Sequence, residues 1–161
     1  MAEMIFREII ESELEAVVEL LDTGFNADKE VLEVTMQTIF DLPDTWGHTY
    51  GLWDGDLLVG TISYGSCYGP DWNGEGIISH LVVREGHRRK GLARKMIDRA
   101  LADLKALKVP CVTVTVEIGN DVALAMWKSY GFEKYDPAFE VVGYYEQYEG
   151  YVKWFGGKEN S

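Results

Sequence analysis

The feature that most restricts the fold of this chain is a buried-strand pattern that runs into a glycine turn and then into an amphipathic helix. Residues 77–83 are apolar and rich in β-branched side chains, which is typical of a largely buried strand. From Leu92 onward the apolar residues recur at helical spacing, so a helix is predicted to begin near Gly91. Its inward face is predicted to hold Leu92, Met96, Ile97, Ala100, Leu101, Leu104 and Leu107. A strand, a tight turn and a helix in this order predict an α/β fold.

The junction between this strand and this helix has the properties of an anion-binding site. The first turn of a helix leaves backbone N–H groups without internal partners and carries partial positive charge. Gly91 can adopt turn dihedrals closed to other residues, and together with Ala93 it leaves room for a phosphate beside the backbone. The basic side chains around it are Arg88, Arg89, Lys90 and Arg94.

Basic charge is concentrated in this part of the chain. Residues 84–108 hold nine Lys or Arg against three Asp or Glu, whereas the other residues hold six against twenty-four. The net charge of −12 argues against a nucleic-acid or anionic-membrane surface but allows one local anion site. The alternative is a solvated basic helix face without a ligand.

Two other phosphate-binding motifs do not match the junction. Gly86 and Gly91 have the spacing of a Walker loop, but Leu92 and Ala93 stand where the Lys and the Ser or Thr would be. No Gly-x-Gly-x-x-Gly follows a predicted strand, so a dinucleotide-binding Rossmann unit has no support. A nucleotide phosphatase built on this loop is therefore disfavoured.

Residues 88–93, with the sequence Arg-Arg-Lys-Gly-Leu-Ala, resemble motif A of the GNAT superfamily of N-acetyltransferases, Arg/Gln-x-x-Gly-x-Gly/Ala. A second motif of that superfamily, Asn-x-x-Ala-x-x-x-Tyr-x-x-x-Gly-Phe, is matched at Asn120, Ala123, Gly131 and Phe132. The resemblance implies an α/β GNAT fold, with a mixed central sheet of about seven strands, flanking helices, and a splay between strands 4 and 5. It also implies one N-acetyltransferase domain over residues 1–161.

The strands and helices predicted along the chain follow the element order of that superfamily. The predicted elements are a strand at 6–10, a helix at 14–25, a second helix capped by Asp28, a hairpin of 49–53 and 57–64 turning at Asp54-Gly55, a loop at 65–76, a strand at 111–117, a helix at 121–130, and later strands that include 144–155. In the second helix Val31, Leu32, Thr35, Met36 and Ile39 are predicted to face the core.

The resemblance implies that acetyl-CoA is the acyl donor, bound mostly by backbone groups. The glycine loop would bind its pyrophosphate, and the strand before the loop would bind its pantetheine arm. A backbone N–H near Val83 would face the thioester oxygen, where charge develops during acyl transfer. The residues implied to contact the donor are Leu81, Val82, Val83, Arg88, Arg89, Lys90, Gly91, Leu92, Ala93, Arg94, Asn120, Ala123 and Trp127.

Proton transfer is where the chain departs from the superfamily pattern. Trp127 stands where the second motif usually has a Tyr that protonates the departing thiolate, and an indole N–H cannot act as that acid. The usual base positions on the strand are occupied by Ile77 and Ser79. Glu75 lies on the same alternating face as Ser79, so these two are predicted to relay a proton through water. His80 points away from that face unless a bulge redirects it, and is predicted to be a hydrogen-bonded, buried histidine.

Other tyrosines are alternatives for the missing acid. They are Tyr64, Tyr68, Tyr130, Tyr144 and Tyr145.

The acceptor is predicted to be a primary amine on a small cationic molecule. Residues 1–83 carry sixteen acidic and two basic side chains, and the loop at 65–76 adds aromatic faces that suit organic cations. Two alternatives stay open: acetylation of a protein N-terminus or lysine, and a non-catalytic acyl-CoA-binding module. The acidic side chains also have a simpler role in keeping the protein soluble.

The remaining expectations concern the setting of the protein. No basic leader and no long apolar run are present, so a cytoplasmic location is expected, with no membrane partner. Cys67 and Cys111 have neither a zinc nor a disulfide spacing, so no metal is expected. The C-terminal aromatic residues can cover a sheet face or form a homodimer interface.

Overall fold

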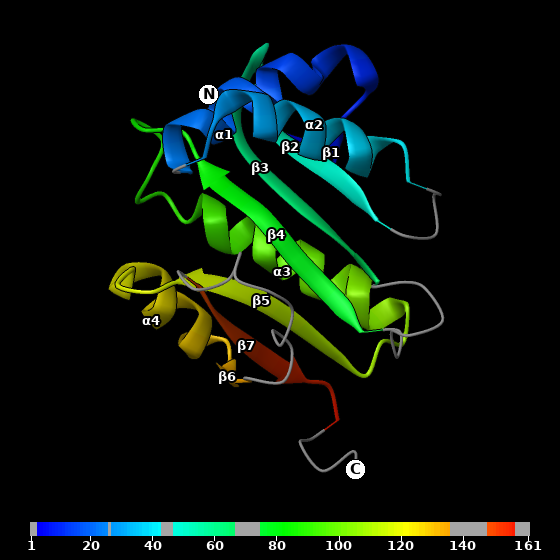
Figure 1. Ribbon diagram of the computed structural model, residues 1–161, viewed down its shortest axis with the longest axis vertical. Helices are drawn as coiled ribbons and strands as arrows, with labels where there is room; N and C mark the ends of the chain where they lie inside the picture. Colours follow the sequence, from blue (N-terminus) through cyan, green and yellow to red (C-terminus); the bar gives the residue numbers. More distant parts are fainter. Residues whose placement is uncertain (1–2, 26, 43–46, 67–74, 136–147, 157–161) are drawn as a thin grey trace. The chain divides into compact units, whose positions relative to one another are not determined.

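A computed structural model of the chain describes residues 3–25, 27–42, 47–66, 75–135 and 148–156 (Figure 1). Its elements, in chain order, are β1 (Ile5–Glu8), the 3-10 helix η1 (Glu11–Glu13), α1 (Leu14–Gly24), α2 (Lys29–Phe40), β2 (His48–Asp54), β3 (Leu57–Ser66), β4 (Gly76–Val83), α3 (Leu92–Ala106), β5 (Cys111–Glu117), α4 (Asp121–Ser129), β6 (Glu133–Lys134) and β7 (Tyr148–Trp154). The strands form one seven-stranded sheet in the order β1-β2-β3-β4-β5-β7-β6. The predicted α/β class with a mixed sheet of about seven strands is confirmed.

The chain divides into two compact units, which are described in turn. Unit 1 consists of Met1–Gly65 and Ile78–Asp103, and unit 2 of Ser66–Ile77 and Leu104–Ser161. The division passes through β4 and through α3. A single domain over residues 1–161 stays a prediction.

In unit 1 the helices α1 and α2 pack on one face of the strands and α3 packs on the other (Figure 1). Between α1, α2 and the strands lies an apolar core formed by Ile9, Leu14, Val17, Val18, Leu20, Leu21, Leu32, Met36, Trp53, Leu58 and Val82. On the other face Met96 of α3 lies against Gly60 of β3, where a Cβ would come within 2.8 Å of the methionine methyl carbon. The absence of a side chain at Gly60 therefore lets α3 approach the sheet closely.

The hairpin of β2 and β3 turns one residue later than predicted. Asp54 still pairs with Leu57 as a strand residue, so the turn consists of Gly55 and Asp56. Gly55 has φ +62° while Asp56 does not have a positive φ, which is the pattern of a type II′ turn with glycine first. The predicted Asp54-Gly55 turn was thus wrong by one position, because glycine is needed at the first turn residue.

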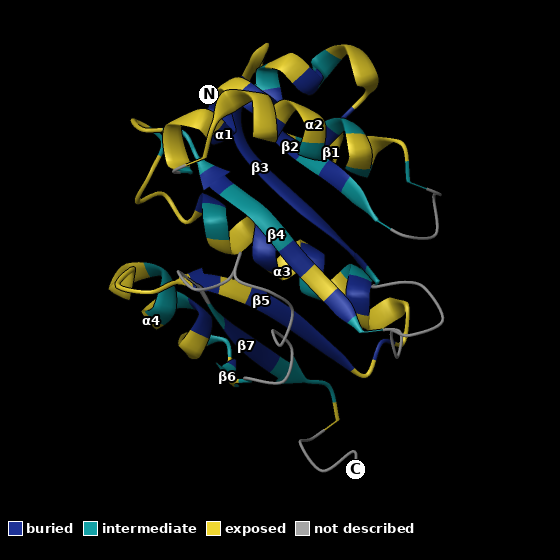
Figure 2. Ribbon diagram, in the orientation of Figure 1, coloured by how far each residue is buried: buried dark blue, intermediate teal, exposed yellow. Residues whose placement is uncertain are grey.

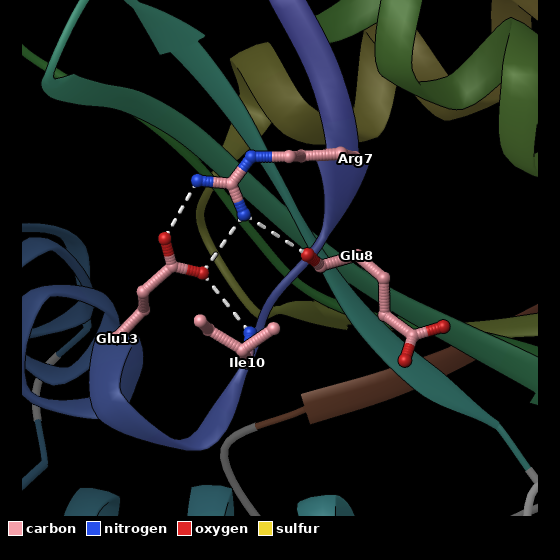
Figure 3. A network of polar contacts seen from close by, with 4 residues as sticks. All are labelled: Arg7, Glu8, Ile10 and Glu13. Carbon is pink, nitrogen blue, oxygen red and sulfur yellow. Dashed lines mark hydrogen bonds and ion pairs between the residues drawn. The ribbon is translucent and has the colours of Figure 1, made fainter.

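The chain enters α1 through a polar network around η1 (Figure 3). The guanidinium of Arg7 binds both carboxylate oxygens of Glu13, at 2.9 and 2.6 Å, and also donates to the carbonyl of Glu8 at 3.2 Å. Glu13 in turn accepts the backbone N–H of Ile10 at 3.0 Å. This bidentate pair fixes the direction in which the chain leaves β1.

In unit 2 the central strand is β5, which pairs with β7 along its whole length in antiparallel register from Cys111–Trp154 to Glu117–Tyr148. β6 pairs with β7, and the first two residues of β4 pair with β5 in parallel. That parallel ladder has two register pairs, Gly76 with Val112 and Ile77 with Thr113. A short parallel ladder agrees with the predicted splay between strands 4 and 5. Figure 2 shows β3 and β5 buried along most of their lengths.

Two predicted core positions are exposed instead. Val31 is 49% exposed because α2 buries its Leu32 and Met36 side. Leu107 is 61% exposed because α3 ends at Ala106, and the helical face does not continue beyond it. In the parts of the chain that the structure describes, no helix is both long enough and apolar enough to span a membrane.

Candidate functional site

The loop between β4 and α3, residues 84–91, ends at a helix start with the geometry of an anion site. Gly91 has φ +75°, and its carbonyl accepts the N–H of Lys95 at 3.0 Å, so it is the residue that precedes the first helical turn. The N–H groups of Leu92 and Ala93 come before the first amide that bonds within the helix. The loop and helix therefore present amide donors and the positive end of the dipole together.

Backbone conformations within the loop reinforce this geometry. Gly86, Arg89 and Gly91 have φ of +91°, +64° and +75°. Mixed right- and left-handed conformations turn successive N–H groups inward and form concavities that bind anions. A Cβ placed on Gly91 would have no protein atom within 4 Å, so there is space for a ligand beside its backbone. The loop thus fits a phosphate group, and only glycine adopts the conformation at 91 without strain.

The basic side chains of the loop are solvent-exposed. Arg88, Arg89, Lys90 and Arg94 all lie on the surface. Arg88 donates its Nε–H to the carbonyl of Val83 at 2.9 Å, so part of this side chain holds the loop to the end of β4. The positive field at the helix start is therefore formed by exposed cations, one of which is anchored to the strand.

The last residues of β4 alternate in burial. Val82 is buried in the core, and its side chain fills the space beside Gly24 of α1, where a Cβ would come within 2.9 Å of its Cγ2. Leu81 and Val83 are half-buried. The side chain of Val82 is thus used for packing, and its predicted role in donor binding can involve only its backbone.

His80 interrupts β4 with a positive φ of +53°. In a regular strand consecutive side chains point to opposite faces, yet Nδ1 of His80 lies 3.1 Å from Oγ of Ser79. The ring meets Phe25 edge-on, with centroids 6.1 Å apart. Burial lowers the pKa of His80 to about 4, so the imidazole is neutral at pH 7 and is a weak base. The predicted hydrogen bond of His80 is present, but the residue is half-buried and not fully buried as predicted.

Glu75 belongs to unit 2 and comes just before the first residue of β4. Its side chain is half-buried, and burial raises the pKa of its carboxyl. Ser79, its predicted partner in a proton relay, belongs to unit 1. That relay stays a prediction.

Asn120 begins α4 as its N-cap residue. Its Oδ1 accepts the N–H of Ala123 at 3.1 Å, which satisfies one of the free amides of the helix start. The spacing of Asn120 and Ala123 in the second motif therefore has a structural explanation that needs no ligand. This capping role was not predicted, although an Asn before an apolar helical pattern is an N-cap signal.

Trp127 is buried on α4. It is 5% exposed and meets Phe132 edge-on with ring centroids 5.1 Å apart. Tyr130, which ends α4, has a carbonyl that accepts a 2.7 Å bond from Lys153. The residue in the usual tyrosine position is thus part of the apolar packing of unit 2.

The predicted site residues fall in both units. Unit 1 holds Ser79, 81–83 and 88–94, and unit 2 holds Glu75, Asn120, Ala123 and Trp127. Among the alternative acids, the Tyr64 hydroxyl donates to Asp103, and Tyr68, Tyr144 and Tyr145 lie outside the described residues.

Metal ligands do not gather anywhere in the described ranges. No group of three or more His, Cys, Asp or Glu side chains there could hold an ion. Cys111 is buried and forms no disulfide within the described residues, and Cys67 lies outside them.

Comparison with known proteins gives one family and many similar folds. The model of the acetyltransferase (GNAT) family matches residues 14–132. An acetyltransferase from Thermus thermophilus has a TM-score of 0.72 at 19% identity, covering 96% of this chain and 98% of that chain. An acetyltransferase from Streptococcus agalactiae has a TM-score of 0.76 at 14% identity, covering 94% and 98%.

A structure of the NatC complex bound to Gag peptide and CoA contains a chain with a TM-score of 0.70 at 17% identity, covering 93% of this chain and 96% of that chain. At identities this low, the structural similarity shows a shared fold only. Among curated proteins no significant match was found.

Proposed function

Because the chain belongs to the acetyltransferase (GNAT) family, we propose that it transfers an acetyl group from acetyl-CoA to a primary amine on a small cationic molecule. The observation that carries this proposal is the start of α3. There Gly91, with φ +75° and open space beside it, precedes free helical amides and lies among exposed basic side chains. This combination suits the pyrophosphate of a coenzyme A thioester.

Donor binding is assigned mainly to unit 1. Gly91, Leu92 and Ala93 contribute backbone amides, and residues 88–90 with Arg94 contribute positive charge. The backbone of 81–83 is assigned to the pantetheine arm. Contacts from Asn120, Ala123 and Trp127 of unit 2 are part of the same proposal.

The reaction needs a neutral amine, a polarised thioester and a proton donor for the thiolate. Acetyl-CoA supplies the activated acyl group, and a new C–N bond replaces its C–S bond. The backbone N–H near Val83 is proposed to stabilise the negative charge on the carbonyl oxygen. The carboxylate of Glu75 is proposed to take the proton that the amine loses, relayed to it through water and the hydroxyl of Ser79.

The acidic charge supports a cationic acceptor. Residues 1–83 hold sixteen acidic side chains and two basic ones, and such a field attracts ammonium groups. A polyamine or an aminoglycoside has this chemistry. A peptide amino group is the second enzymatic candidate, and it is supported by the NatC complex, which contains a chain of similar fold and was solved bound to Gag peptide and CoA.

A non-catalytic acyl-CoA-binding module is the candidate from another functional class. It is favoured by Trp127, which fills the usual acid position with a buried indole. Against it, loss of one acid or base typically costs about 10²–10⁴-fold in rate, which leaves measurable activity. A cytoplasmic location and a homodimer stay predictions.

The test is thiol release from acetyl-CoA with a panel of polyamines, aminoglycosides, amino acids and short peptides, beside controls without amine. Release with one amine class establishes the enzyme and names its acceptor. Calorimetry on the same protein measures acetyl-CoA binding. Tight binding with no release across the panel would favour the binding module, and no binding would overturn the proposal.

A further inference from the structure

Arg84 makes two contacts to β3 at the point where the chain leaves β4. Its backbone N–H donates to the carbonyl of Val59 at 2.7 Å, and its side-chain Nε–H donates to the carbonyl of Leu58 at 2.8 Å. One residue thus binds two consecutive carbonyls of a strand that lies about 25 positions earlier in the chain. The side chain is half-buried, so these bonds are partly shielded from water.

The first half of the β4–α3 loop is held at further points. The carbonyl of Arg84 accepts the N–H of His87 at 3.0 Å and closes a turn. The imidazole Nε2 of His87 lies 3.7 Å from the carboxylate of Asp54, the last residue of β2. With the bond from Arg88 to the carbonyl of Val83, residues 84–88 are fastened to β4 and to the end of the β2–β3 hairpin.

We propose that Arg84 is a positioning residue for the anion site at Gly91. By fastening the loop to β3, it sets the path of the backbone that reaches Gly91 before any ligand arrives. A loop ordered in advance loses less conformational freedom on binding, and the ligand is then held more tightly. This inference rests on the proposed function, because it takes the pyrophosphate of acetyl-CoA as the anion.

The atom through which Arg84 bonds to β3 allows a positioning role to be distinguished from direct binding of the phosphate. The bond to Leu58 comes from Nε, which is the same number of bonds from Cα as the amide nitrogen of glutamine. Arg84→Gln therefore keeps a donor at that place without the charge. Arg84→Met has a similar length and no donor, and Arg84→Lys keeps the charge with its nitrogen one atom further out.

The experiment measures acetyl-CoA affinity by calorimetry for the full chain and these variants. Arg84→Met is expected to bind about tenfold more weakly, the effect of about one hydrogen bond. Arg84→Gln is expected to restore affinity to within about threefold of the wild type. Binding of S-acetylpantetheine, which lacks the pyrophosphate, is measured by NMR titration and should be the same in all variants.

Two results would overturn the positioning role while leaving the donor assignment intact. One is an Arg84→Met protein that binds acetyl-CoA as tightly as the wild type. The other is an Arg84→Gln protein that loses as much affinity as Arg84→Met, which would mark a direct charge contact. A wild-type protein that does not bind acetyl-CoA would instead overturn the proposed function and this inference with it.

A control variant tests whether the loss of any positive charge weakens binding. Arg99→Gln removes a charge from α3, where Arg99 pairs with Asp103, and should leave acetyl-CoA affinity unchanged. If Arg84→Met does not fold, Arg84→Gln and Arg84→Lys decide the question. Positioning through Nε predicts that the glutamine variant binds at least as tightly as the lysine variant, whereas a charge contact predicts the reverse.

Discussion

The hydroxyl of Tyr64 donates a 2.5 Å hydrogen bond to Oδ2 of Asp103, and so joins β3 to α3 within unit 1. The phenol is buried, while Asp103 also pairs with Arg99 on the exposed side of the helix. Burial and the neighbouring carboxylate raise the pKa of Tyr64 far above its usual value, so the hydroxyl stays protonated. This relationship makes Tyr64 a structural residue and a poor candidate for the acid that Trp127 replaces.

Removing that hydroxyl should destabilise the fold. Tyr64→Phe is expected to lower the free energy of unfolding by about 1 kcal/mol, because one charge-assisted bond is lost at a site partly screened by water. Urea denaturation measures the change. Asp103→Asn keeps an acceptor oxygen and should lose less, and a Tyr64→Phe protein as stable as the wild type would show that the bond contributes nothing.

Gly91 and Gly86 form a matched pair for testing the anion site. Both have positive φ and open space at the Cβ position, so an alanine strains the backbone similarly at each, by about 1 kcal/mol. Only Gly91 lies at the start of α3. Gly91→Ala is therefore expected to weaken acetyl-CoA binding at least tenfold and Gly86→Ala much less, as measured by calorimetry. Equal losses would show that backbone strain explains the effect.

The larger variant Gly91→Trp should abolish measurable acetyl-CoA binding by filling the space beside the loop. Undiminished affinity in that variant would remove the pyrophosphate from this place.

Local sequence patterns predicted most elements, because they depend on neighbouring residues. Alternating Val and Thr placed a strand at 111–117 with the bounds that the structure shows. The switch to helical spacing placed the start of α3, and the glycine there has the left-handed backbone expected of it. Boundaries were less accurate where one residue decides them, as at Gly55, whose turn type requires glycine in the first position.

Long-range contacts could not be predicted in this way. The carbonyl that Arg84 binds belongs to Leu58, and no local pattern identifies a partner 26 positions away. The positive φ of His80 is likewise invisible in an apolar strand pattern, yet it brings the Ser79 and His80 side chains together. The role of Asn120 could have been found, since a capping residue has a local signal that the motif match obscured.

Asn120 allows capping and ligand contact to be separated. Asn120→Ala removes the bond to the N–H of Ala123 and should cost about 1 kcal/mol of stability. Asn120→Asp keeps the cap but lacks the amide NH₂. If Asn120 contacts the donor through that NH₂, the aspartate variant keeps its stability and loses acetyl-CoA affinity. Full affinity in the aspartate variant would limit Asn120 to a capping role.

Trp127 allows the missing acid to be tested directly. Trp127→Tyr places a phenol at the usual superfamily position. Trp127→Phe places a ring of nearly the same size as tyrosine there, without the hydroxyl. Because the indole is buried, both variants are expected to lose stability to a similar extent, about 1–3 kcal/mol. A higher kcat in the tyrosine variant alone, with unchanged acetyl-CoA affinity, would locate the acid there. Equal kcat in the two variants would show that position 127 serves packing only.

His80 should make the stability of the fold depend on pH. Its pKa is lowered to about 4 by burial, whereas a histidine in the unfolded chain titrates near 6.5. Below pH 6.5 the unfolded chain therefore binds a proton that the folded chain does not, and stability falls as the pH falls toward 4. Well above pH 6.5 the imidazole is neutral in both the folded and the unfolded chain, so His80 no longer makes the stability depend on pH.

The measurement belongs between pH 7.5 and 5.5, away from the isoelectric point of about 4.6 where the chain loses its net charge. Over that range His80 should account for about 1 kcal/mol of lost stability in urea denaturation. His80→Asn is the matched variant, because asparagine tolerates the left-handed backbone and can still accept a bond from Ser79. Its stability should fall less over the same range. An identical fall in both proteins would mean that other groups cause the acid sensitivity and that His80 protonates freely in the folded chain.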